Sequence, residues 1–233
     1  MEWIRRQKFR ALLFALIVVV LIYPIFQDLT TTRIVFDVLR TIFFILALFI
    51  IFDAKRQRIL AFVIGVPTIL VGWTYAIVSD PPPMLLDVVF HSLATVFFAI
   101  TVYTILHAVY RDDDVTSDSV YGAFCSYLLV GVVFGHLYCI FEASAPGSFR
   151  TADPATAALF ALDRGHYILS YFSLMTITTV GYGDITPATA PTRALAVIEA
   201  VVGQFYIAVL VAELIGKRVS QSVANRHSQD PGA

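Results

Sequence analysis

The sequence predicts an all-α membrane protein with six transmembrane helices and one shorter helix that enters the membrane and turns back. Of its 233 residues, 58% are hydrophobic and 14% are charged, whereas ordinary globular domains carry about a quarter charged residues. The mean hydropathy is +0.79, and six segments approach or exceed the ~20 apolar residues that a helix needs to cross a bilayer. This composition excludes a disordered chain, a nucleic-acid-binding tail and a disulfide scaffold.

The six predicted spans follow one another along the chain as apolar runs. They cover residues 11–26, 34–52, 59–78, 84–110, 120–141 and 194–215. The first run follows a basic stretch, as the core of a signal peptide does, but no small-residue cleavage site comes after it. We therefore expect it to remain as the first helix of a multi-pass protein.

The basic residues predict the orientation of these spans, because cytoplasmic loops carry an excess of Lys and Arg. With the N-terminus inside, most of the 16 basic residues fall on the cytoplasmic side. The outer side receives only Arg33, Arg150, Arg164 and Arg193, and Arg40 stays within the second span. Six crossings place both termini in the cytoplasm, and the expected location is the cell (plasma or inner) membrane.

A shorter mixed segment, residues 167–184, lies between the fifth and sixth spans. Only residues 167–178 precede the glycines at positions 181 and 183, and a helix of that length is too short to cross. The chain is therefore expected to enter the membrane and turn back. Irregular backbone at that depth is tolerated only where it is buried in protein or lines a water-filled path.

The run Thr-Val-Gly-Tyr-Gly-Asp at positions 179–184 resembles the signature of tetrameric potassium channels. The resemblance covers residues 120–217 as outer helix, pore helix, selectivity filter and inner helix, and the stretch 199–210 is most similar to bacterial members. The first four spans match the six-helix layout of that superfamily by number only. The alternative is a glycine turn in a loop, which the preceding Thr pair, the short helix and the flanking spans disfavour.

This resemblance implies that filter oxygens replace the hydration shell of K⁺. The implied ligands are backbone carbonyls and the Thr179 hydroxyl, and the filter residues are Thr179, Val180, Gly181, Tyr182 and Gly183. One chain supplies one strand of a ring that needs four, so the expected assembly is a homotetramer. Membrane lipids are the expected surroundings. No nucleic-acid partner is expected, and no cofactor besides the permeant K⁺.

The residues expected to support the filter include Asp184 at its outer mouth. In related channels this carboxylate bonds to an aromatic residue of the pore helix, and Tyr171 is the matching donor here, with a merely solvated Asp184 as the alternative. The position that carries a buried Glu in some relatives is Met175, so no carboxyl pair is expected.

Glu199 is the second expected support, because an ionisable group in an apolar span is costly unless it is paired, neutral or in contact with water. It either carries a proton and donates a hydrogen bond, or is ionised and accepts bonds from Ser173 or Thr176. Both alternatives tie the inner helix to the pore helix.

Below the filter, Gly203 matches the inner-helix hinge of the family. A close helix contact is the alternative, since small residues are common at membrane helix interfaces. On the same alignment Gln204 and Ile207 face the water-filled cavity, which the hydroxyls of Thr178 or Thr179 join from above. Thr178 is also counted among the residues expected to support the filter.

The expected organisation is a four-helix domain over residues 1–118, a pore domain over 119–217 and a short cytoplasmic tail over 218–233. Voltage sensing needs several Lys or Arg within the membrane field, because each charge contributes about 2.3 kcal/mol per 100 mV. The fourth span contains none. The first domain therefore has a sensor-like layout without gating arginines.

Several local contacts follow from spacing alone. Asp87 with His91, and Glu213 with Lys217, stand at i and i+4 and are expected to pair. The fifth span is expected to be capped at its N-terminus by one of three polar residues, Ser117, Asp118 or Ser119.

The expected function is passive, potassium-selective conduction with weak or absent voltage gating. An enzyme is not expected, since no nucleophile, metal cluster or phosphate loop is recognisable. The alternatives are a non-conducting membrane sensor or scaffold and a channel-derived K⁺ transporter subunit. The transporter design packs four degraded filters into one chain, and a scaffold would leave the signature unexplained. Lipid, tension, pH and an unidentified regulatory partner all remain open as gating stimuli.

Overall fold

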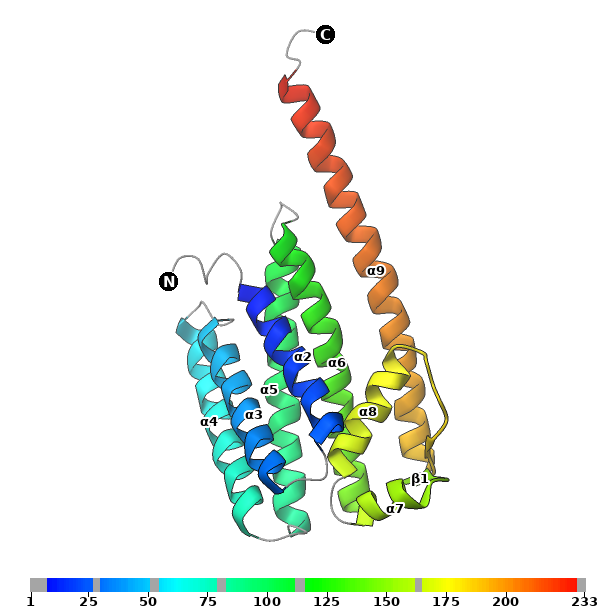
Figure 1. The fold of residues 1–233 in the computed structure, drawn as a ribbon. Helices are drawn as coiled ribbons and strands as arrows, with labels where there is room; N and C mark the ends of the chain where they lie inside the picture. Colours follow the sequence, from blue (N-terminus) through cyan, green and yellow to red (C-terminus); the bar gives the residue numbers. More distant parts are fainter. Residues whose placement is uncertain are drawn as a thin grey trace.

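The computed structural model describes residues 8–26, 30–50, 55–78, 83–111, 116–161 and 165–229. Within these ranges, long helices form an elongated bundle in which successive helices alternate in direction (Figure 1). The long helices are α2 (Lys8–Phe26), α3 (Thr30–Ile50), α4 (Lys55–Val78), α5 (Met84–Arg111), α6 (Ser117–Ser144) and α9 (Ala190–Gln229). The shorter elements lie toward one end of the bundle and are β1 (Phe149–Thr151), α7 (Pro154–Ala161), α8 (Gly165–Ile177) and β2 (Ile185–Pro187).

Each predicted span corresponds to one long helix, and the predicted re-entrant segment begins with α8. The largest difference is at the end of the chain, where α9 continues to Gln229, well past the predicted end at residue 215. Apolarity sets the length of a span, but a helix continues through polar residues as long as each has adequate helix propensity. No Pro or further Gly follows Gly216 within α9 to stop it.

Four helices of the described chain are long and apolar enough to cross a membrane, namely α4, α5, α6 and α9. In α3 the corresponding apolar stretch among described side chains, Val38–Leu48, is shorter. The chain is therefore a multi-pass membrane protein. The count of six crossings stays a prediction for α2 and α3, because the side chains of residues 21–37 lie outside the described part.

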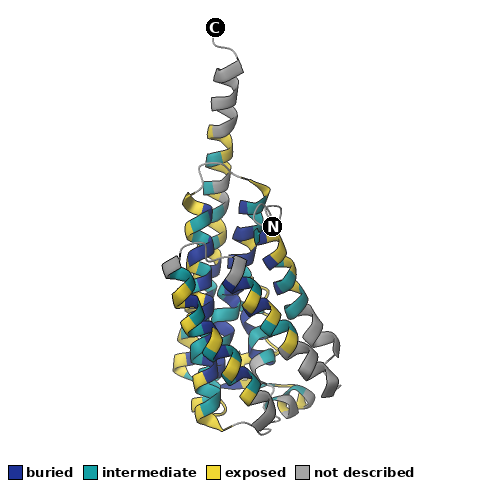
Figure 2. Cartoon of the chain, turned by 90° about the vertical axis from the view of Figure 1, so that its left-hand side faces the viewer, coloured by how far each residue is buried: buried dark blue, intermediate teal, exposed yellow. Residues whose placement is uncertain are grey.

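The outer faces of the bundle are apolar. Buried positions line the inside of the bundle, and many of the outward positions are exposed (Figure 2). Among the exposed side chains, Phe14, Val63, Leu70 and Leu85 each present 61% to 75% of their surface. Soluble monomers rarely expose large contiguous apolar areas, whereas lipid chains would cover them favourably.

Two hydrophobic cores meet along α6. The first packs α2 to α5 against the first half of α6 and is centred on phenylalanines, with the rings of Phe44 and Phe97 4.5 Å apart. The second packs the other half of α6 against α8, and there the ring of Phe172 lies 5.2 Å from Tyr138 and 5.3 Å from Phe149. α6 is thus the element through which the first four helices contact the α8–α9 region.

The N-cap of α6 differs from the prediction. It is Thr116, whose hydroxyl accepts from the Ser119 backbone amide while the Thr116 amide donates to the Ser119 hydroxyl. This reciprocal capping box satisfies two backbone donors at once, which a cap one or more residues later does not. Asp118 accepts instead from the Phe9 and Arg10 amides, at 3.5 and 3.2 Å, and so joins the start of α2.

The loop after α6 contains the two strands and α7. β1 pairs antiparallel with β2, with Arg150 opposite Thr186, and the Ala188 amide donates to the Ser148 carbonyl at 2.8 Å. No structure was predicted for this loop. The pairing fixes the loop to the residues that directly follow the 179–184 run.

Candidate functional site

The backbone of the 179–184 run has an unusual conformation. Thr179, Gly181 and Gly183 have φ of 59°, 53° and 77°, and no other non-glycine residue of the described chain has a positive φ. Val180 and Tyr182 between them therefore have negative φ. Alternation between left- and right-handed dihedrals turns successive peptide groups the same way, whereas a strand turns them to opposite sides. The run thus presents a row of backbone carbonyls.

The turn out of α8 holds the start of this row. The Thr179 amide donates to the Thr176 carbonyl at 2.9 Å, and the Gly181 amide donates to the Met175 carbonyl at 3.1 Å. A left-handed φ at a threonine is costly and persists only where the surroundings impose it. The side chains of the run face away from any core of this chain, and Val180 and Tyr182 are 50% and 72% exposed.

At the outer end of the run, the Tyr171 hydroxyl of α8 donates to Asp184 at 2.9 Å. The structure therefore has the hydrogen bond that the sequence allowed, in place of a merely solvated carboxylate. This hydrogen bond joins the middle of α8 to the residue that directly follows Gly183. Met175 supplies no second carboxyl group.

Glu199 is fully buried where α9 crosses α8 and α6. Its Oε2 accepts a 2.5 Å hydrogen bond from the Tyr138 hydroxyl of α6, and its Oε1 contacts the Ser173 hydroxyl of α8. Ser173 was one of the two expected partners. The other, Thr176, donates instead to the Phe172 carbonyl within its own helix at 2.8 Å.

Tyr138 is the member of this cluster that sequence reasoning missed. It lies 61 residues before Glu199, in a span where aromatic residues are frequent, and no periodicity marks it. Its ring packs in the second core with 0% exposure, which is where a tyrosine needs a partner for its hydroxyl. A buried tyrosine and a buried glutamate on neighbouring spans were the only available signal.

The contacts of the Ser173 hydroxyl favour one of the two forms of Glu199, ionised or protonated. The Ser173 oxygen lies 2.6 Å from the Gly131 carbonyl and also contacts Glu199, yet it has one proton to donate. If Glu199 is ionised, the Ser173 proton serves the carboxylate and leaves two oxygens at 2.6 Å with no proton between them. If Glu199 carries a proton, it donates to Ser173, and Ser173 donates to Gly131. The geometry favours the protonated acid.

Gly203 touches the end of α8. A Cβ on Gly203 would lie 2.4 Å from the Ile177 carbonyl oxygen and 2.7 Å from Ile177 Cγ1, distances that no side chain tolerates. The same carbonyl accepts from the Tyr127 hydroxyl of α6 at 2.8 Å. The close contact therefore accounts for the glycine without a hinge, and α9 continues as helix through this position.

The remaining expected residues lie below the run. The Gln204 side-chain amide donates to the Thr179 hydroxyl at 3.3 Å, and Ile207, one turn on, is 43% exposed. The Thr178 hydroxyl turns back and donates to the Leu174 carbonyl at 2.6 Å. The structure thus brings Gln204 to Thr179 and leaves the Thr178 hydroxyl bonded to α8.

Residues 156–219, which contain α8, the carbonyl row and most of α9, match a family model described as ion channel. The two pore potassium channel c of Oryza sativa subsp. japonica is 31% identical over 91 residues, which cover 39% of this chain and 17% of that protein. This chain therefore spans only a small part of that relative. No solved structure matches the chain. The matched region coincides with the part of the structure that holds the carbonyl row.

Proposed function

We propose that this chain is one subunit of a homotetrameric, potassium-selective channel that conducts K⁺ passively. The observation that carries the proposal is the alternating φ from Thr179 to Gly183, between a short helix that ends within the bundle and a long apolar one. A K⁺ ion that leaves water needs replacement oxygens at each step of its path. A row of carbonyls on one side of a chain is suited to supply them.

Four copies are needed to close the ring around an ion. The exposed filter side chains and the exposed apolar residues of α9 support this assembly, because neither has a partner surface within the described part of one chain. Those of α9 include Val197, Val201, Phe205 and Val209. In the tetramer these surfaces would be buried between subunits, with Gln204 and Ile207 facing a cavity below the filter and the bond between Tyr171 and Asp184 bracing it from behind.

Conduction should depend only weakly on voltage. α5 contains no Lys or Arg before Arg111 in its last turn, so the position of a voltage-sensing helix carries no gating charge within the membrane. Residues 1–118 are then a membrane domain that packs against the pore domain of residues 119–217, with residues 218–233 as a cytoplasmic tail. Both termini are assigned to the cytoplasm and the protein to the cell membrane, on the distribution of basic residues.

The test is K⁺ over Na⁺ selectivity of the purified protein in planar bilayers. Ion gradients should give reversal potentials near the K⁺ equilibrium potential. Gly181→Ala should abolish conductance or selectivity while the oligomer still assembles, because a Cβ at φ 53° strains the backbone even though nothing lies within 4 Å of it.

Gly147→Ala is the matched control. Gly147 also has a positive φ, 87°, and open space around its Cβ position, but it lies in the loop before β1. The Gly147→Ala protein should keep both conductance and selectivity. Unchanged K⁺ preference in Gly181→Ala channels would contradict the filter assignment, and an oligomer without conductance in the parent protein would favour a non-conducting sensor or scaffold.

A further inference from the structure

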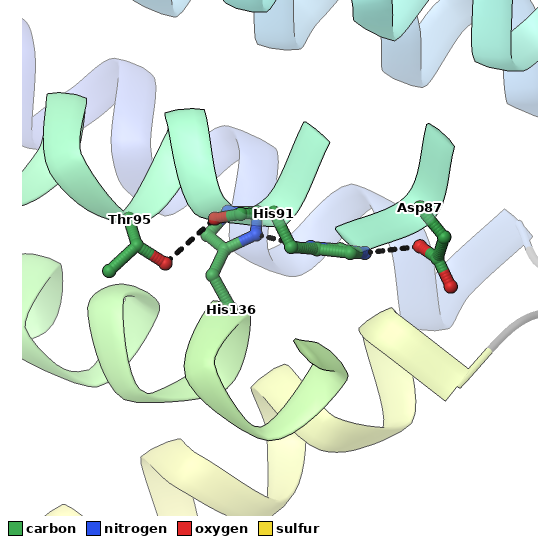
Figure 3. Close-up of polar contacts among 4 residues, drawn as sticks. All are labelled: Asp87, His91, Thr95 and His136. Atoms are coloured by element: carbon green, nitrogen blue, oxygen red, sulfur yellow. Dashed lines mark hydrogen bonds and ion pairs between the residues drawn. The ribbon is translucent and has the colours of Figure 1, made fainter. Parts of the chain in front are cut away.

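Two histidines meet in the interface between α5 and α6. The Nδ1 atoms of His91 and His136 lie 2.7 Å apart, and Nε2 of His91 lies 3.0 Å from the Asp87 carboxylate. Figure 3 shows the three side chains in a row, with Asp87 and His91 from α5 and His136 from α6. The pair of Asp87 and His91 predicted from the sequence is confirmed. The contact with His136 was not predicted. None of the three belongs to the proposed ion path.

The distance between the two Nδ1 atoms requires one shared proton. Two unprotonated nitrogens would repel each other at 2.7 Å, and two N–H groups would collide. A neutral imidazole has one protonated and one bare nitrogen, and the hydrogen bonds made by each decide which is which. The Asp87 carboxylate favours a proton on Nε2 of His91. Nδ1 of His91 is then bare and accepts from the Nδ1–H of His136.

This arrangement has room for one further proton. It binds at Nε2 of His136, and the bond between the two Nδ1 atoms stays intact as an imidazole–imidazolium pair. A second added proton would place two hydrogens between the Nδ1 atoms and break the contact. We propose that His91 and His136 form a single proton-binding site that links α5 to α6, with Asp87 as its counter-ion.

The surroundings of the pair are apolar, with two charged groups of opposite effect. Phe98 stacks on His136, with ring centroids 5.5 Å apart, and His91 is 1% exposed. Among the described residues, the charged groups that face the pair are Asp87 of α5 and Arg40 of α3, which acts electrostatically on both imidazoles. Burial away from water is the largest effect and opposes the added charge, Arg40 opposes it further, and Asp87 favours it.

A proton would reach the pair from the N-terminal end of α5. Asp87 lies in the first turn of that helix, and its side chain is 14% exposed. This end of α5 lies toward the same end of the bundle as α7 and β1 (Figure 1), which the basic residues assign to the outer side. The site should therefore equilibrate with protons of the outer solution.

α6 connects this site to the support of the carbonyl row. Gly135, next to His136, packs so closely on α8 that a Cβ would lie 3.0 Å from Ser170 Cα, and Tyr138 two residues on holds Glu199. A positive charge added at His136 therefore lies on α6 directly beside the contacts by which α6 holds α8 and α9. This step rests on the proposed function, while the proton site does not.

The test is ¹⁵N NMR of the full chain, labelled at histidine and reconstituted in lipid nanodiscs, over pH 4 to 8. The chain has five histidines, so signals are assigned by single substitutions. We expect a scalar coupling between the two Nδ1 nuclei through their shared proton, and uptake of one proton by the pair in a joint step. Two independent titrations without that coupling would overturn the proposal.

Three variants sharpen the result. Asp87→Asn should lower the proton affinity of the pair, and Arg40→Gln should raise it, each on the order of tenfold or one unit in midpoint. His107→Gln is the matched control, because His107 is an exposed histidine of the same helix, and it should leave the joint step unchanged. Equal midpoints in the Asp87 and Arg40 variants would contradict the role of the two charges. These readouts need no conducting channel, so their failure is distinct from failure of the filter assignment.

Discussion

The Tyr138 hydroxyl donates to the Glu199 carboxyl group over a distance of 2.5 Å. With Ser173 on the other oxygen, one buried acid joins α6, α8 and α9. A buried carboxyl group that lacks such partners is expensive, so the three residues depend on one another.

Glu199→Gln should preserve conduction and Glu199→Ala should not. A glutamine amide donates to Ser173, and its carbonyl accepts from Tyr138, as the protonated acid does. Alanine leaves both hydroxyls without a partner, at a cost of about 1–3 kcal/mol each. Single-channel open probability at acid and neutral pH measures the difference. If Gln behaves like Ala, Glu199 is ionised in the native protein. If the open probability of both variants matches that of the parent, Glu199 has no role in conduction.

Tyr138→Phe removes one donor and keeps the ring in the core. We expect the protein to lose about 1–3 kcal/mol of stability, because Oε2 of Glu199 stays buried without a partner. Thermal unfolding in detergent measures this loss. Tyr103→Phe is the control, since Tyr103 is 64% exposed on α5, and an equal effect of both substitutions would contradict the assigned hydrogen bond.

Gly203→Ala separates a close contact from a hinge. Because a Cβ would meet backbone atoms of Ile177, α9 or the end of α8 must move, and both stability and conduction should fall. Gly216→Ala, in the same helix with nothing within 4 Å of the added carbon, should be neutral or slightly stabilising. A Gly203→Ala protein with unchanged melting temperature and altered opening kinetics would restore the hinge interpretation.

Voltage dependence should be shallow. Four sensors rich in arginine would supply about 12 or more elementary charges, whereas residues 84–110 contain no Lys or Arg. Current families recorded between negative and positive potentials should therefore give a far smaller effective gating charge. A value near 12 would mean that charged groups elsewhere in the chain move through the field.

Features encoded by neighbours in sequence could be predicted. Apolar runs predicted the helices, and the i, i+4 spacing predicted the ion pair of Glu213 with Lys217, which is confirmed at 3.8 Å. The 179–184 run was recognisable because glycine is required where φ is positive. The left-handed Thr179 was not predictable from composition, because a neighbouring helix end imposes it.

Contacts between distant spans could not be predicted. His91 and His136 lie 45 residues apart, and their meeting depends on how α5 and α6 rotate about their axes, which similar apolar faces do not specify. The same holds for Tyr138. The prediction of the α6 cap was wrong for a local reason. Four adjacent polar residues all suit an N-cap, and only the reciprocal bond of Thr116 with Ser119 distinguishes them.

The pairing of β1 with β2 couples the loop after α6 mechanically to the end of the carbonyl row. Thr151 lies opposite Ile185, the residue directly after Asp184, and Ile185 is only 4% exposed. A force that lifts the loop is therefore passed to the upper end of the carbonyl row without an intervening flexible segment. If the carbonyl row is the proposed ion path, a molecule that binds this loop would displace the end of that path without contacting the residues of the row.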